Sequence, residues 1–220
     1  MSILSLRLAK PAARGFLALA VPHAAGAIAN LHTPVSYAQQ SAASPPKREL
    51  VFALDVSRTK VSYTLDATAH TVHGEFRLKS GTVRFDPATG DAAGEIVIDA
   101  ASGNSGNDSR DEKMRREVLE SARYPEIAFR PDHVQGDVAL PGKSQVNIHG
   151  IFQIHGVGHE ITVPADVDCA ADGCQVFAKW VVPYVDWGMK NPSTFFLRVG
   201  KTVEIEFQTK IRFDSPAAGR

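Results

Sequence analysis

From Leu50 onward, apolar and polar residues alternate with a period of two, and this pattern constrains the fold more than any other feature. Such alternation places successive side chains on opposite faces of a β-strand, so it predicts strands with one buried and one solvent-facing side. Val176–Val182 and Phe195–Val199 are strongly apolar and continue the series. The alternating segments are Leu50–Leu54, Val61–Leu65, Val72–Leu78, Glu95–Asp99, Val146–Ile154 and Val203–Phe207.

Strands of this number and spacing predict an antiparallel sheet with one buried face. Closing such a sheet into a barrel removes its exposed edges. A barrel of about eight strands is just wide enough to be filled by side chains or to hold one small ligand. We therefore expect an all-β fold, an antiparallel barrel of about eight strands with one short helix inserted.

The inserted helix is predicted over residues 108–121. Asp108 or Ser109 can cap its first free amide groups. Pro125 forces Tyr124 out of helical geometry, so the helix must end before that residue. A single short helix in a β chain suggests a lid, a plug or a bracket on the barrel.

The charges and apolar residues of this helix separate onto different faces. Ion pairs four residues apart are expected for Asp111 with Arg115 and for Glu112 with Arg116. Three apolar residues share a narrow face, which leaves open whether they cover a ligand or plug the barrel; they are Met114, Val118 and Leu119.

The N-terminal region resembles an export signal. Arg7, Lys10 and Arg14 form a basic segment ahead of an apolar, alanine-rich stretch, and Ser36 and Ala38 supply small residues before a cleavage point. An uncleaved anchoring segment is the alternative. We expect a signal peptide over 1–38, a flexible linker over 39–49, the β domain over 50–213 and a tail over 214–220. The mature protein would then be exported, to a periplasm or as a secreted protein.

Charge excludes one class of partner. The chain of 220 residues has 24 basic and 24 acidic residues. Only basic charges occur in residues 1–38, so the remainder has a net charge of about −3. No basic footprint of a nucleic-acid-binding protein is present. Charges interrupt every apolar stretch well short of the roughly 20 residues that a spanning helix needs, so no membrane span is expected in the mature protein.

Cys169 and Cys174 are the only cysteines and flank a turn containing Asp172-Gly173. The turn would place the two cysteines opposite each other across a hairpin, close enough for a disulfide. Free thiols are the alternative and would fit a cytosolic protein. No histidine accompanies them at zinc spacing.

Several motifs in a fixed order identify a family. The chain resembles the YceI-like, polyisoprenoid-binding family over about Leu50 to Phe213. Each motif is weak alone, but their order is specific. They are Phe52-Ala53-Leu54-Asp55, Val72-His73-Gly74-Glu75-Phe76, Phe85-Asp86-Pro87, Arg110-Asp111, Tyr124-Pro125-Glu126-Ile127-Ala128-Phe129, Gly150-Ile151-Phe152-Gln153-Ile154-His155-Gly156-Val157 and Asp186-Trp187-Gly188.

The resemblance implies a lipocalin-like, up-and-down barrel exported to the bacterial periplasm. It also implies that an isoprenoid chain, such as a quinone tail or polyprenyl compound, binds in an elongated apolar cavity without a cofactor. The family has no established catalytic residues. Tyr184 stands where the family often has Arg, which affects the cavity's shape and hence the ligand. The sequence leaves open whether the chain forms a homodimer.

The apolar face holds the candidate ligand-binding residues. The same side chains could simply fill a barrel core. Arg110 could be a polar group at the cavity mouth or an ion-pair partner at the helix N-terminus. The candidates are Phe76, Phe85, Ile98, Arg110, Phe129, Ile148, Phe152 and Trp180.

Other chemistry has less support in the sequence. His155 and His159 are four apart, but glycines between them indicate a turn, so a metal site is not expected. No nucleophile-elbow or P-loop pattern is present, and we expect no enzyme activity. Two rivals remain open. One is a fully packed barrel that serves in envelope stress or interaction, with a low internal volume. The other is an enzyme acting on isoprenoids or quinones, with a titratable pair inside the cavity.

Overall fold

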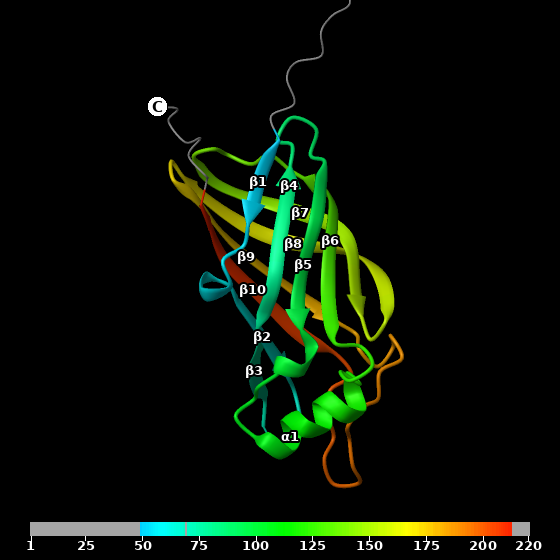
Figure 1. Ribbon diagram of the computed structural model, residues 1–220. Helices are drawn as coiled ribbons and strands as arrows, with labels where there is room; N and C mark the ends of the chain where they lie inside the picture. Colours follow the sequence, from blue (N-terminus) through cyan, green and yellow to red (C-terminus); the bar gives the residue numbers. More distant parts are fainter. Residues whose placement is uncertain (1–48, 69, 213–220) are drawn as a thin grey trace, which may run out of the picture. The chain divides into compact units, whose positions relative to one another are not determined.

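The computed structural model describes residues 49–68 and 70–212, which form one curled antiparallel sheet and a short helical segment (Figure 1). The predictions for 1–38, for most of 39–49 and for the C-terminal tail lie outside these residues. The strands are β1 (Leu50–Ala53), β2 (Lys60–Leu65), β3 (Val72–Phe76), β4 (Leu78–Phe85), β5 (Ala92–Asp99), β6 (Glu126–Gln135), β7 (Gly142–Ile154), β8 (Val157–Ala170), β9 (Gly173–Val182) and β10 (Val203–Arg212).

The sheet has the strand order β1-β4-β5-β6-β7-β8-β9-β10-β2-β3, and every neighbouring pair is antiparallel. From β4 to β10, strands consecutive in sequence are adjacent in space. This is the up-and-down topology expected, and it confirms the all-β class.

The sheet contains ten strands where about eight were expected, because two passages of the chain along the sheet are each divided into two strands. The short 3-10 turn η1 (Val56–Arg58) separates β1 from β2, and Arg77 alone separates β3 from β4. Asp55 stabilises the first break by accepting a hydrogen bond from the Ser57 amide at 2.8 Å. The first pass consequently pairs with β4 through β1 and with β10 through β2, which curls the sheet around its inner face.

Alternation along the strands produces the buried inner face as predicted. On β8, Val163, Ala165 and Val167 are buried, whereas Pro164 and Asp166 between them are exposed. Most of the buried apolar residues form one cluster on this face. The hydrophobic core therefore lies inside the curl of the sheet.

The expected disulfide is present between Cys169 and Cys174. These residues face each other in the register of β8 and β9, on either side of a turn at Ala171 and Asp172. The bond closes the hairpin at one end of the sheet.

The helical segment begins where the sequence predicts but winds differently. Helix α1 (Asp108–Lys113) is capped by Asn107, whose side chain accepts from the Arg110 amide, so the expected caps Asp108 and Ser109 were wrong by one or two residues. The segment continues as a π-helix, η3 (Met114–Val118).

The π-helix changes which side chains share a face. The Leu119 amide donates to the Met114 carbonyl at 2.9 Å, a bond between residues five apart. In an α-helix such residues would lie about 140° apart, since each residue turns about 100°. The i→i+5 pattern winds more slowly and brings them closer to alignment. The segment ends at Glu120, which adopts a left-handed conformation with φ 46°.

One expected ion pair on this segment is absent. The Asp111 carboxylate is buried and accepts hydrogen bonds from the Ser105 amide at 3.0 and 3.1 Å. Arg115 instead pairs with Glu112 at 3.2 Å, so the predicted Asp111–Arg115 pair was wrong. Glu112 and Arg116 do approach, at 3.8 Å.

The apolar segment Phe195–Val199 is not a strand. It lies in the loop of residues 183–202 between β9 and β10, which we call the β9–β10 loop; within the segment only Val199 pairs, in an isolated bridge with Ala67. Strand β10 begins at Val203. Apolar composition alone therefore misplaced this segment in the sheet. No helix among the described residues is long and apolar enough to cross a membrane.

Candidate functional site

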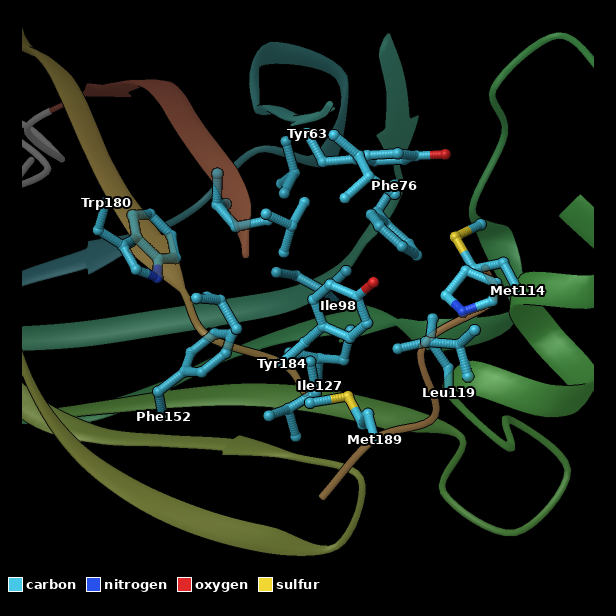
Figure 2. Close-up of a pocket in the computed structure, with 18 residues that line it drawn as sticks. Tyr63, Phe76, Ile98, Met114, Leu119, Ile127, Phe152, Trp180, Tyr184 and Met189 are labelled. Atoms are coloured by element: carbon cyan, nitrogen blue, oxygen red, sulfur yellow. The ribbon is translucent and has the colours of Figure 1, made fainter. Parts of the chain in front are cut away.

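Two apolar cavities lie against the inner face of the sheet. The first, which we call the helix-end cavity, has a volume of about 100 Å³. It is lined by side chains of β2, β9 and β10, of the helical segment and of the β9–β10 loop. Figure 2 shows Phe152 and Trp180 at one side of this cavity, and Met114 and Leu119 from the helical segment at the other.

The second, the hairpin-end cavity, has a volume of about 160 Å³. It lies toward the β4–β5, β6–β7 and β8–β9 hairpins, at the end of the sheet that carries the disulfide. Its lining includes Phe52, Phe85, Phe129, Ile148 and Val176. Both cavities expose only apolar surface, so either suits a hydrocarbon group.

The two cavities share three lining residues: Ile98 on β5, Phe152 on β7 and Trp180 on β9. We call these three residues the waist. The rings of Phe152 and Trp180 meet edge to face with their centroids 5.9 Å apart. The waist therefore separates two apolar spaces that follow one another along the inside of the sheet.

Seven of the eight ligand-binding residues predicted from the sequence line these cavities. Phe76 lines the helix-end cavity. Phe85, Phe129 and Ile148 line the hairpin-end cavity, and the remaining three form the waist. The structure thus gathers the predicted aromatic and aliphatic candidates around two adjoining apolar cavities.

Arg110 lines neither cavity. Its Nε donates to Ser105 Oγ at 2.7 Å and its Nη2 donates to the Ser105 carbonyl at 2.9 Å. The guanidinium forms no ion pair within residues 49–68 and 70–212. Arg110 and its neighbour Asp111 instead hold the loop before α1 against the helix, so the interpretation of Arg110 as an ion-pair partner was wrong.

Several lining residues were missed by the sequence patterns. Tyr184 and Met189 come from the β9–β10 loop, where no periodicity marks an inward side chain. Tyr63 differs from these two, because the alternation over Val61–Leu65 had placed it on the inner face although it was not among the candidate ligand-binding residues. It lines the helix-end cavity from β2, directly opposite Gly74 on β3. A Cβ atom at Gly74 would lie 2.4 Å from the Tyr63 ring, so glycine at this position makes room for the tyrosine. Gly74 in the Val72-His73-Gly74-Glu75 motif is the sequence feature that could have indicated a bulky side chain at this position on the neighbouring strand.

The waist contains one buried hydrogen-bond donor without a partner. Trp180 Nε1 is buried and has no hydrogen-bond partner among the described residues. His159 Nε2 is likewise buried without a hydrogen-bond partner among the described residues. The His159 ring stacks on Trp187 with the ring centroids 3.8 Å apart, and burial lowers the pKa of His159. Leaving such a group unpaired costs about 1–3 kcal/mol, which an oxygen atom of a ligand could recover at Trp180.

Titratable chemistry is scarce around the cavities. The residues that line them include two tyrosines, Tyr63 and Tyr184, but no Asp, Glu, His, Lys or Arg. Burial raises the pKa of both phenols, and Tyr184 donates to the Gly200 carbonyl at 2.6 Å. Across the described part of the chain, no group of three or more His, Cys, Asp or Glu residues is placed to hold a metal ion.

The sequence profile of the YceI-like domain matches residues 52–211, nearly the whole of the curled sheet. The chain belongs to the YceI-like domain family. This match confirms the resemblance inferred from the motifs. No curated protein sequence gives a significant match to the chain.

Solved structures share the fold of this YceI-like domain at low identity. A polyisoprenoid binding domain from Saccharophagus degradans, implicated in plant cell wall breakdown, aligns with a TM-score of 0.59 and 18% identity over 75% of this chain and 99% of its own. Burkholderia cenocepacia BcnA aligns with a TM-score of 0.58 and 20% identity over 71% of this chain and 98% of its own. A Campylobacter jejuni YCEI protein has a TM-score of 0.51 and 13% identity over 88% of this chain and 100% of its own.

Proposed function

We propose that this YceI-like domain binds an amphiphilic lipid with an isoprenoid-type tail, such as a quinone or a polyprenyl compound. The observation that carries the proposal is the pair of wholly apolar cavities that adjoin at the waist. A linear hydrocarbon chain is the ligand that such a narrow, two-part space fits best. The Saccharophagus degradans relative described as a polyisoprenoid binding domain supports the same class of ligand.

Burial of the tail supplies the affinity. Each CH₂ group removed from water contributes about 0.8 kcal/mol, so a tail of several isoprene units can bind tightly without ion pairs or a cofactor. The neutral, apolar lining agrees with this mode of binding, because it offers no charged group to a ligand. Sequestration or carriage of the lipid, with no chemical step, is the activity proposed.

A quinone suits the waist better than a plain hydrocarbon does. The Trp180 indole N–H is buried there and has no hydrogen-bond partner in the part of the chain that the structure describes. Neither cavity exposes this N–H, so a quinone carbonyl would accept a hydrogen bond from it once the waist rings have moved apart, at a gain of about 0.5–1.5 kcal/mol. We therefore place the quinone head group at the waist and its tail in one of the cavities.

The volumes favour a second candidate. At about 100 and 160 Å³, both cavities are smaller than the roughly 300–1,000 Å³ typical of ligand pockets. A barrel that carries no ligand and acts through its surface is consistent with such values. Lipid binding requires the waist rings and the two flexible methionines, Met114 and Met189, to move apart.

Native mass spectrometry of protein purified from the bacterial envelope separates the two candidates. Lipid binding predicts an additional non-covalent mass of several hundred daltons that organic solvent removes. Protein that is always ligand-free, and that takes up neither added quinone nor added polyprenol, would favour the surface-acting barrel.

Export to the periplasm completes the proposal. The basic and apolar pattern of residues 1–38 suits an export signal, and the Cys169–Cys174 disulfide suits an oxidising compartment outside the cytoplasm. Cleavage after Ala38 would leave Gln39 as the first residue of the mature protein. N-terminal sequencing of protein from the periplasmic fraction tests this, and an intact Met1 in that fraction would contradict cleavage.

A further inference from the structure

Two phenylalanines of the β9–β10 loop are exposed far beyond the other large apolar residues of the described chain. The exposed fraction is 88% for Phe195 and 90% for Phe196, whereas the next most exposed, Val181, reaches 57%. The two rings meet each other edge to face at 5.1 Å. Two adjacent aromatic rings that are this exposed indicate a surface that binds a membrane or another molecule.

The loop presents this pair from a defined turn. The Thr194 amide donates to the Leu197 carbonyl at 2.8 Å, and the Leu197 amide donates to Thr194 Oγ1 at 3.2 Å, so the two phenylalanines occupy the tip of a closed turn. We call these four residues the aromatic tip. The exposure of the rings therefore follows from the backbone conformation of the loop.

The base of the loop is anchored to the helical segment. Lys190 Nζ lies 2.7 Å from Glu117 Oε2, and Lys113 Nζ donates to the Pro192 carbonyl at 3.1 Å. Figure 1 shows the loop, in orange, at the same end of the sheet as α1. The aromatic tip thus projects from a fixed platform.

The same loop also lines the helix-end cavity. Tyr184, Met189 and Pro192 contribute to the lining, and Pro192 lies only three residues before Phe195. The aromatic tip therefore belongs to the same loop that forms part of the cavity wall.

Exposed basic side chains follow the tip in the loop. Arg198 and Lys201 are exposed, and neither forms an ion pair among the described residues; exposed Asp186 is the acidic residue of the loop. Aromatic rings at the depth of lipid head groups, with basic side chains beside them, are typical of segments that bind a membrane surface. Anionic lipid head groups would complement Arg198 and Lys201.

We propose that the aromatic tip inserts into the surface of a lipid bilayer and so places the helix-end cavity where a lipid can pass between membrane and protein. The inference rests on the proposed lipid-binding function for its purpose, but membrane insertion can be measured by itself. A bilayer suits the tip because two adjacent rings at the apex of a turn can enter head groups without a shaped partner surface.

Flotation with vesicles of phosphatidylethanolamine and phosphatidylglycerol tests insertion directly. The double variant F195S/F196S should lose about tenfold or more in vesicle binding, because both rings lose their burial in the bilayer. Its thermal melt should match the wild type, since neither ring packs in the core. The control variant V51S/V181S removes two exposed apolar side chains elsewhere and should bind vesicles like the wild type.

A transfer assay separates this inference from the proposed function. The F195S/F196S variant should take up a polyprenyl quinone from detergent micelles as well as the wild type does, but extract it from vesicles more slowly. If the wild type takes up no quinone from micelles, the proposed lipid binding is overturned. The flotation assay still tests membrane insertion in that case, because it does not depend on quinone uptake. Equal vesicle binding by wild type and variant would overturn insertion. A wild-type dimer that F195S/F196S converts to a monomer, with no change in vesicle binding, would overturn it as well.

Discussion

The rings of Phe152 and Trp180 meet edge to face, 5.9 Å apart, at the point where the two apolar cavities adjoin. Phe152 comes from β7 and Trp180 from β9, with β8 between these strands. An edge-to-face pair contributes only about 0.5–1.5 kcal/mol beyond burial of the rings. Burial of a few CH₂ groups of a tail is therefore enough to offset separation of the pair.

Replacing Phe152 with leucine should open the waist. We expect faster uptake of a polyprenyl quinone, because the smaller side chain leaves a passage between the cavities. The free energy of unfolding should fall by about 1–2 kcal/mol, less than the 3–5 typical of Phe→Ala. Phe177→Leu on the exposed face of β9 is the matched control and should change neither quantity. Wild-type uptake kinetics in folded F152L would show that the waist does not limit passage.

Replacing Trp180 with phenylalanine should discriminate between ligands. The variant retains an aromatic ring at the waist but loses the indole N–H, which has no partner within the described chain. Quinone affinity should fall by about 0.5–1.5 kcal/mol, or roughly two- to tenfold, while affinity for an isoprenoid hydrocarbon of similar length, which has no oxygen to accept the bond, should stay the same. Isothermal titration with both ligands measures the difference. An equal loss for both would mean that ring packing, and no hydrogen bond, was removed.

Reduction of the disulfide should lower stability without changing the fold. Cys169 and Cys174 close a loop of only a few residues, so the bond constrains the unfolded chain modestly, by about 2 kcal/mol. The C169S/C174S variant should unfold at a lower urea concentration with an unchanged slope. Added reductant should shift the wild type to the same midpoint and leave the variant unaffected. A larger shift with a changed slope would mean that the hairpin itself unfolds.

Acid should break one of the two contacts that anchor the β9–β10 loop to the helical segment, the Lys190–Glu117 ion pair, and leave the Lys113–Pro192 hydrogen bond in place. Lys190 and, secondarily, Arg116 donate to the Glu117 carboxylate and lower its pKa from 4.5 to about 2. Because the folded pKa lies below the unfolded one, the contact stabilises fully above about pH 4.5 and is lost as the pH falls through 2. A carboxyl NMR titration measures this pKa. In K190Q it should move back toward 4.5, and an unmoved value would exclude the Lys190 contact as its cause.

The strands and their faces were predictable because alternation determines which side chains point inward. Phe152 and Ile154 on β7 are buried, as their period-two spacing with Val146 requires. The same pattern identified most of the cavity lining. It could not give the cavity volumes, because these depend on how Phe152 and Trp180 pack across strands that are not adjacent in the sheet.

Local polar contacts were harder to predict. Asp111 was expected to pair with Arg115, but loop geometry buries its carboxylate against Ser105. The alignment of Met114 with Leu119 depends on an i→i+5 hydrogen bond, which leaves no residue signature. The Phe195–Val199 segment has the composition of a strand, yet turn formation at Thr194 left its phenylalanines in solvent.

Quenching of Trp180 fluorescence by a polyprenyl quinone tests lipid binding at the waist most directly. The chain has two tryptophans, so Trp187→Phe leaves Trp180 as the sole reporter. The proposed function predicts saturable quenching at one quinone per chain in dilute detergent. Emission that stays constant in folded protein, or that falls only in proportion to quinone in the micelles, would contradict a ligand at the waist.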